Sequence, residues 1–276
     1  PLLLPAVWSL LTFSMCRLDF NNFIIFLKKK ATLAVLVIWL LIICPILMWF
    51  TVSNIPVSEG TLFAIIMTAG SSPLIGAAAI GRLLRLNSEI ILGLLISTTI
   101  LVPITLPFIA IEFLGIELGL NTTELFLRLS LLIGSAGFAA SIIRHVGTKF
   151  QTRMSEQSLD GITVLLLWAC GVPLMDGVLE HLLMDPKNTL LIILISFSVY
   201  IGLMIIGTIF AFMMWRDWSS AMSVGLACGC RNLAVIIVVL PSDIDQQVTL
   251  YFALAQFPIY LMPMVLSFIG SRILNK

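Results

Sequence analysis

The chain has 276 residues, of which 60% are hydrophobic and 11% are charged, with a mean hydropathy of +1.13 and a formal net charge of +1. This composition excludes a soluble globular domain and indicates an integral membrane protein. At about 20 apolar residues per membrane-spanning helix, the length leaves room for about eight to ten helices and for no separate catalytic domain. The basic residues are scattered over short loops, so we expect no nucleic-acid partner.

Nine apolar segments are predicted to cross the bilayer, at residues 1–16, 31–52, 60–84, 90–111, 125–143, 159–183, 190–215, 218–241 and 248–269. The first is short for a spanning helix, and we expect a truncated start with one helix missing before Pro1. The sixth has only about 15 apolar residues before Asp176, so its end is expected to lie amphipathically in the membrane interface. The five cysteines fall within apolar segments, and their odd number argues against a disulfide framework.

The basic residues predict the orientation of these segments. Most of them fall in every second loop, on the side of the C-terminus. By the positive-inside rule that side is cytoplasmic, so we expect a multi-pass protein of the cell (inner) membrane with a cytoplasmic C-terminus. Arg128 lies in the first turn of the span 125–143, where its side chain is expected to extend toward the membrane interface.

Two of the predicted spans are interrupted near their centres. Gly70-Ser71-Ser72-Pro73 interrupts the span 60–84, and Gly229-Cys230-Arg231-Asn232 interrupts the span 218–241. Interrupted helices in corresponding positions of two halves predict a transporter. Because the two are entered from opposite sides, residues 31–111 and 190–269 are predicted to form an inverted repeat. The fold class is therefore an all-α membrane protein, with nine helices visible of ten, in an inverted five-plus-five repeat with two discontinuous crossing helices.

The crossing of the interrupted helices is the predicted binding site. Backbone groups freed at a break cannot be satisfied by lipid, so protein or water must surround them. Half-helices that start near Leu74 and Leu233 would point their positive ends at the crossing, and the Arg231 guanidinium adds a full charge, which favours an anion. The candidate substrate-binding residues are the polar or break-forming residues Ser71, Ser72, Pro73, Arg231, Asn232, Ser97, Thr98 and Gln256, and Thr99 is expected around the crossing beside Ser97 and Thr98.

Structural roles compete with these ligand roles. Serine and threonine hydroxyls in membrane helices also bond to the preceding helical turn or to a neighbouring helix. Arg231 could instead bond to the carbonyl groups exposed by the other break, which would make its role purely structural.

The sequence resembles the bile acid:sodium symporter family over nearly its whole length. The resemblance rests on LLTFSMCRLDFNNF, ICPILMWF, the Ser-Ser-Pro break followed by RLLRL, and CGCRNLAVIIVVLP, the last being closest to bacterial members with Gly-x-Arg-Asn at the second break. It implies ten helices, with the first absent here. It also implies a core domain, residues 31–111 and 190–269 with broken helices 60–84 and 218–241, and a panel domain, residues 1–16, 125–143 and 159–183. Movement of core against panel would open the crossing to each side in turn.

The sequence departs from that family at the sodium positions. Sodium-coupled members carry Glu-x-x-x-Gln-Asn at the second break, and this chain has Ala227 and Arg231 at the matching positions, with Pro73 in place of asparagine at the first break. A guanidinium cannot deprotonate, and a cation site needs oxygen ligands. We therefore predict no cofactor and no metal site, with sodium as an alternative, and interpret Arg231 as occupying the place of the cation.

The predicted function is secondary transport of a small organic anion by alternating access across a lipid bilayer. One alternative is a metalloid oxyanion efflux carrier, suggested by Cys228-x-Cys230. Another is a non-transporting membrane sensor or scaffold. We predict no enzyme activity, because the sequence has no His-Glu-x-x-His, Gly-x-Ser-x-Gly or clustered aspartate motif, and because His145 and His181 are expected in loops on opposite faces. The sequence leaves open the substrate, coupling ion, direction of transport and oligomeric state.

Overall fold

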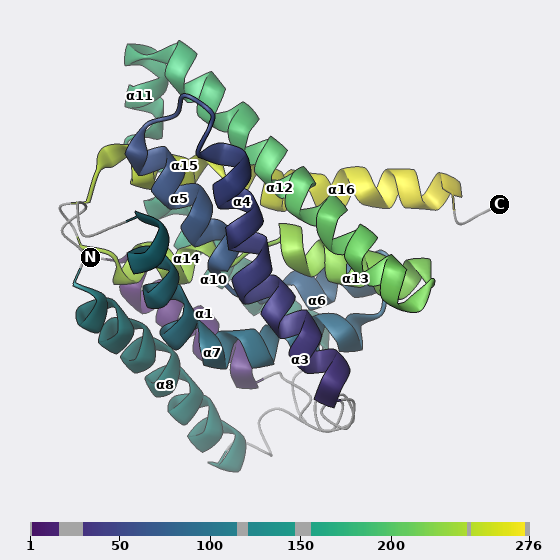
Figure 1. The fold of residues 1–276 in the computed structure, drawn as a ribbon. Helices are drawn as coiled ribbons and strands as arrows, with labels where there is room; N and C mark the ends of the chain where they lie inside the picture. The colour runs from purple at the N-terminus through teal and green to yellow at the C-terminus, as the bar shows by residue number, and fades with distance from the viewer. Residues whose placement is uncertain (1, 17–29, 115–120, 147–155, 242–243, 274–276) are drawn as a thin grey trace.

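The computed structural model describes residues 2–16, 30–114, 121–146, 156–241 and 244–273 (Figure 1). Every regular element in these ranges is a helix. The basic loop segments 17–29 and 147–155 and residues 274–276, which enter the predicted membrane orientation, lie outside the described residues.

The helices follow the predicted spans to within a few residues. In chain order they are α1 (Leu3–Cys16), α3 (Lys30–Ile38), η1 (Trp39–Ile43), α4 (Cys44–Val52), α5 (Glu59–Gly70), α6 (Ala77–Leu83), α7 (Ser88–Leu114), α8 (Thr122–Val146), α10 (Glu156–Leu174), α11 (Val178–Met184), α12 (Pro186–Trp215), α13 (Trp218–Gly229), α14 (Leu233–Val239), α15 (Gln246–Leu254) and α16 (Gln256–Ile273). The two histidines expected in loops lie in helices instead, His145 near the end of α8 and His181 in α11.

Among the described residues, five helices are long and apolar enough to cross a membrane: Lys30–Val52, Ser88–Ile111, Thr122–His145, Pro186–Trp215 and Gln246–Leu266. A sixth span results if Gly161–Leu174 and Val178–Met184, which are bent by 41° relative to each other, count as one. The protein is thus an all-helical membrane protein. The other predicted spans are α1, which has 14 residues, and the two interrupted helices, whose separate pieces are short. The nine spans and the inverted repeat stay predictions.

Side-chain oxygens cap the N-terminal ends of several helices. Ser58, Asp185, Asp217 and Asp245 each accept a backbone N–H in the first turn of α5, α12, α13 and α15. Such caps satisfy N–H groups that have no partner within the helix. The hydrogen bonds from Ser220 to the Asp217 carboxylate also hold the pKa of Asp217 below its ordinary value.

The helices fall into two groups that meet along α7. α1 contacts α8 and α10, whereas α12 packs along α13 over much of its length. Figure 1 shows α8 and α13 on opposite sides of the molecule. α7 contacts α5, α6 and α13 on one side and α8 on the other, so the boundary between the groups runs along α7.

Two glycines let α13 approach α12 closely. A Cβ atom at Gly225 would lie 2.7 Å from the Met204 carbonyl oxygen, and one at Gly229 would lie 3.0 Å from the Tyr200 carbonyl oxygen. Only glycine fits such contacts with backbone without displacing it. α12 therefore supports α13 up to the residue at which α13 ends.

The last predicted span differs from a single straight helix. Ala255 separates α15 from α16. Pro258 has no N–H for the carbonyl of Leu254, four residues earlier, and this loss bends or breaks a helix. Figure 1 shows α16 projecting from the bundle toward the C-terminus.

Candidate functional site

The two interrupted helices meet at their breaks. Leu74 N, in the break between α5 and α6, donates to the carbonyl of Cys230 at 2.7 Å. Asn232 N, in the break between α13 and α14, donates to the carbonyl of Ser72 at 2.9 Å. Pro73 and Arg231 face each other in this short antiparallel bridge. The breaks thus supply hydrogen-bond partners for each other, which extended backbone at membrane depth requires.

The second half-helix begins at Leu233 as predicted, but the first begins at Ala77 and not near Leu74. The difference follows from the pairing of the breaks. Leu74 N is bonded to Cys230, and the chain makes a turn, closed by a 2.9 Å bond from Ala77 N to the Leu74 carbonyl, before the helix starts.

Arg231 is fully buried at the crossing and bonds to three backbone carbonyls. Nε donates to Cys228 O at 2.6 Å, and Nη2 donates to Leu40 O at 3.4 Å. Nη1 donates to Ser71 O. The guanidinium therefore joins the end of α13, the first break and η1, which matches the structural alternative considered for this residue.

The Leu40 carbonyl can accept this bond because η1 is a π-helical turn. The N–H of Cys44, four residues after Leu40, donates to Trp39 O instead. The fifth residue after Leu40 is Pro45, which has no N–H. Neither Cys44 nor Pro45 therefore donates a helical hydrogen bond to Leu40 O. A π-helical turn within an α-helix is frequent at functional sites.

The side chains of three other candidates donate hydrogen bonds to backbone carbonyls of their own chain segment. Ser71 Oγ donates to Thr68 O at 2.8 Å, Thr98 Oγ1 donates to Leu94 O at 2.6 Å, and Gln256 Nε2 donates to Phe252 O at 3.3 Å. These are bonds to the preceding turn, the alternative given for the hydroxyl groups.

The remaining candidates lie at or near the crossing. Ser72 and Asn232 are buried and their backbones pair, and the Asn232 side chain does not cap α14. Ser97 is half-buried on α7. The structure thus brings the candidates on the two breaks together. Of the residues expected around the crossing, Thr99 lines the large cavity described next.

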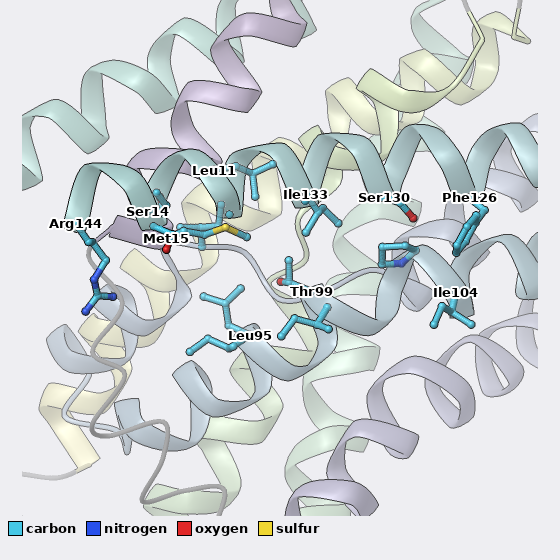
Figure 2. A pocket seen from close by; sticks show the side chains of 18 of the residues that line it. Leu11, Ser14, Met15, Leu95, Thr99, Ile104, Phe126, Ser130, Ile133 and Arg144 are labelled. Carbon is cyan, nitrogen blue, oxygen red and sulfur yellow. The ribbon is translucent and has the colours of Figure 1, made fainter. Parts of the chain in front are cut away.

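A cavity of about 900 Å³ lies between α7 on one side and α1 and α8 on the other (Figure 2). Ile75, within the first break, contributes to its wall, so the cavity reaches the crossing. Figure 2 shows Arg144 at one end, with Phe126 and Ile104 at the other. Most of its lining is apolar, and the polar side chains are Ser14, Thr99, Ser130, Ser141, Arg144 and His145.

Ser14 lines this cavity and has an unpaired hydroxyl group. Its side chain is 8% exposed, and Oγ has no hydrogen-bond partner among the described residues. Buried hydroxyl groups almost always have a partner, so an orphan in the wall of a cavity makes that cavity a candidate binding site.

Apart from Thr99, sequence reasoning did not identify the lining of this cavity, although α8 carries a signal for it. Gly134, Gly137 and Ser141 recur on one helical face, and all three line the cavity. A small-residue face in a membrane helix is also typical of close helix packing, so the sequence alone could not separate the two interpretations.

Arg128 forms hydrogen bonds to two segments. Nη1 donates to Val239 O of α14 at 3.1 Å, and Nη2 pairs with Glu124 one turn earlier. The side chain therefore connects α8 to the second interrupted helix, and its extension toward the membrane interface stays a prediction.

No protein-family model and no curated protein matches this chain. The resemblance to bile acid:sodium symporters therefore stays a prediction from the sequence.

Proposed function

We propose that this chain is a secondary transporter of a small amphipathic organic anion, which it moves across a lipid bilayer by alternating access. The observation that carries the proposal is the cavity between α7 and the pair α1 and α8. Its volume of about 900 Å³ lies within the range of about 300–1,000 Å³ typical of small-molecule sites.

The lining of the cavity favours an anion with an apolar body. Apolar side chains of α7 and α8 would cover the body of the substrate, and the Arg144 guanidinium at one end would attract a carboxylate or sulfonate. The Ser14 hydroxyl can donate a further hydrogen bond to such a headgroup. This assignment moves the proposed charge contact from Arg231 to Arg144.

Arg231 then stabilises the moving part of the transporter. By joining three backbone segments it makes the crossing rigid, so that α3 to α7 and α12 to α16 can move as one core against the panel helices α1, α8 and α10. A permanent cation at this place makes a sodium ion there unnecessary, and we propose transport that does not depend on sodium.

The order of the elements supports an inverted repeat. The segments α3–α7 and α12–α16 each contain one interrupted helix, and the two breaks pair in antiparallel fashion. The Arg128 to Val239 bond links panel to core at one end of the cavity, and movement of panel against core would have to break it.

Uptake into proteoliposomes tests the proposal. The purified protein is assayed with labelled amphipathic carboxylates and sulfonates, in sodium and in potassium buffers. We expect uptake in both buffers, lost in Arg144→Gln and reduced about tenfold in Ser14→Ala, the loss of one hydrogen bond of about 1.4 kcal/mol.

Arg82→Gln is the matched control, because Arg82 is an exposed arginine of α6 and does not line the cavity. Uptake that requires sodium would overturn the coupling proposal. Absence of binding and uptake for every anion tested, with the protein folded, would favour the sensor or scaffold alternative.

A further inference from the structure

The large cavity extends along almost the whole of α8. Phe126 and Arg144 lie at its opposite ends (Figure 2), which are about 27 Å apart along α8 at the helical rise of about 1.5 Å per residue. The hydrocarbon core of a bilayer is about 30 Å thick, and α8 is one of the helices long and apolar enough to cross it. The cavity therefore extends through most of the depth of the membrane.

The cavity opens sideways along α7. Two of its wall residues, Ile100 and Ile104, are each 61% exposed. Phe108 and Ile111 continue the same exposed face of α7 beyond the cavity. Because α7 is also a candidate membrane-spanning helix, an exposed apolar face at this depth contacts the acyl chains of lipids. The wall of the cavity is thus continuous with the lipid-facing surface of the protein.

The two ends of the cavity differ in chemistry. Arg144 and His145 lie in the last turn of α8, where the candidate span ends, so the charged end of the cavity lies at the membrane surface. Figure 2 shows Ser14, with its unpaired hydroxyl, near this end. At the opposite end the lining residues, such as Phe126 and Ser130, carry no charge. This arrangement matches a ligand with one anionic group and a long apolar chain.

We propose that the cavity binds a long-chain fatty carboxylate that enters from the bilayer along α7. The carboxylate lies at Arg144, and the chain extends along α8 toward Phe126. A short anion would occupy only the charged end and leave the apolar walls without a partner. Entry from the side keeps the chain in an apolar environment throughout, so that no apolar surface has to cross water. The inference rests on the proposed function, since it names the substrate class of the same cavity and its route of entry.

Photo-crosslinking in proteoliposomes tests the position of the ligand. The probes are two forms of palmitate, with a photoreactive diazirine either next to the carboxylate or at the end of the chain, and the crosslinked peptides are identified by mass spectrometry. The first probe should label the region of Ser14 and Ser141, and the second should label the region of Ile104 and Phe126. An excess of unlabelled palmitate should remove both labels. Hexanoate, which has the same headgroup on a short chain, should not remove them at the same concentration.

A side chain placed at the middle of the cavity should shorten the space for the chain. Gly134 lines the cavity between its two ends, and a Cβ atom there would meet no atom within 4 Å. Gly134→Leu should therefore fold and reduce labelling by the chain-end probe at Ile104 and Phe126 by about tenfold or more, the effect of an overpacked site. Gly171→Leu is the matched control, because Gly171 also has open space around it and does not line the cavity.

The outcomes separate this inference from the proposed transport. Labelling as expected without uptake would refute the transport and leave the lipid site standing. Uptake of short anions without labelling that palmitate can remove would overturn the inference and leave the transport standing. Equal competition by hexanoate, or unchanged chain-end labelling in folded Gly134→Leu, would also overturn it. If Gly134→Leu does not fold, the positions labelled in the wild type and the two competition experiments decide.

Discussion

Replacement of Arg231 by lysine separates its structural role from a role in binding an anion. Lysine keeps the positive charge, so the cost of burying a charge changes little. Its ammonium group lacks the planar set of N–H donors, however. It cannot bond at once to the three carbonyls that accept from Nε, Nη1 and Nη2 of Arg231.

The expected loss of stability follows from the three hydrogen bonds. The ammonium group can retain one of the two short bonds, to Cys228 O or Ser71 O. The other short bond, to a charged donor, contributes about 1.5–3 kcal/mol, and the 3.4 Å bond to Leu40 O contributes about 0.5–1.5 kcal/mol. Arg231→Lys should therefore lower the free energy of unfolding by about 2–4.5 kcal/mol.

Denaturant unfolding in detergent, followed by tryptophan fluorescence, measures this loss. Arg82→Lys serves as the control, because Arg82 is exposed on α6, and it should change the free energy of unfolding by less than about 0.5 kcal/mol. If Arg231→Lys is as stable as the wild type but binds anions more weakly, the carbonyl bonds are incidental and the residue is a substrate ligand after all.

Three further predictions concern the helix packing, the link between panel and core, and a helix cap. Gly225→Ala should destabilise the protein by about 1–3 kcal/mol, because its methyl group would meet α12 backbone, whereas Gly171→Ala, with open space around it, should not; unfolding midpoints decide this. Arg128→Gln loses the bond from the guanidinium to Val239 O and should speed the labelling of a cysteine placed in the cavity. Stability should change little, because the Arg128 side chain is 42% exposed and solvent weakens the bond. An unchanged labelling rate would rule out the link. The pKa of Asp217 is lowered in the folded protein, so the ionised cap stabilises the fold fully at pH values above the ordinary aspartate pKa. This stabilisation should disappear as the pH falls through the lowered pKa. Asp217→Asn should remove that part of the acid dependence of the unfolding midpoint.

The helices themselves could be predicted because each is set by local sequence. Uninterrupted apolar segments must form helices in lipid, and this places α7, α8 and α12 close to their predicted ranges. The breaks could be predicted for the same reason, since Gly, Ser and Pro at 70–73 and Gly229 weaken the helix locally. The kink at Ala255 was missed, although Pro258 carries a local signal for it.

The site could be predicted only in part, because side-chain partners come from distant segments. The sequence identified Arg231 as the unusual buried charge, but its contact with Leu40 depends on a π-helical turn 191 residues away. A local pattern can predict that a residue is buried, but not which backbone group it will meet.

By itself, the sequence determined that this chain is an all-helical membrane protein with two interrupted helices, since hydropathy and helix breakers act over a single turn or span. Only the tertiary structure decided that Arg231 is bonded to carbonyls and that the large cavity lies between α7 and α8. The physical reason is that close packing and the hydrogen bonding of buried polar groups decide which side of a membrane helix faces its neighbours. A helix with apolar residues on all sides carries little sequence information about its packing or its hydrogen bonds.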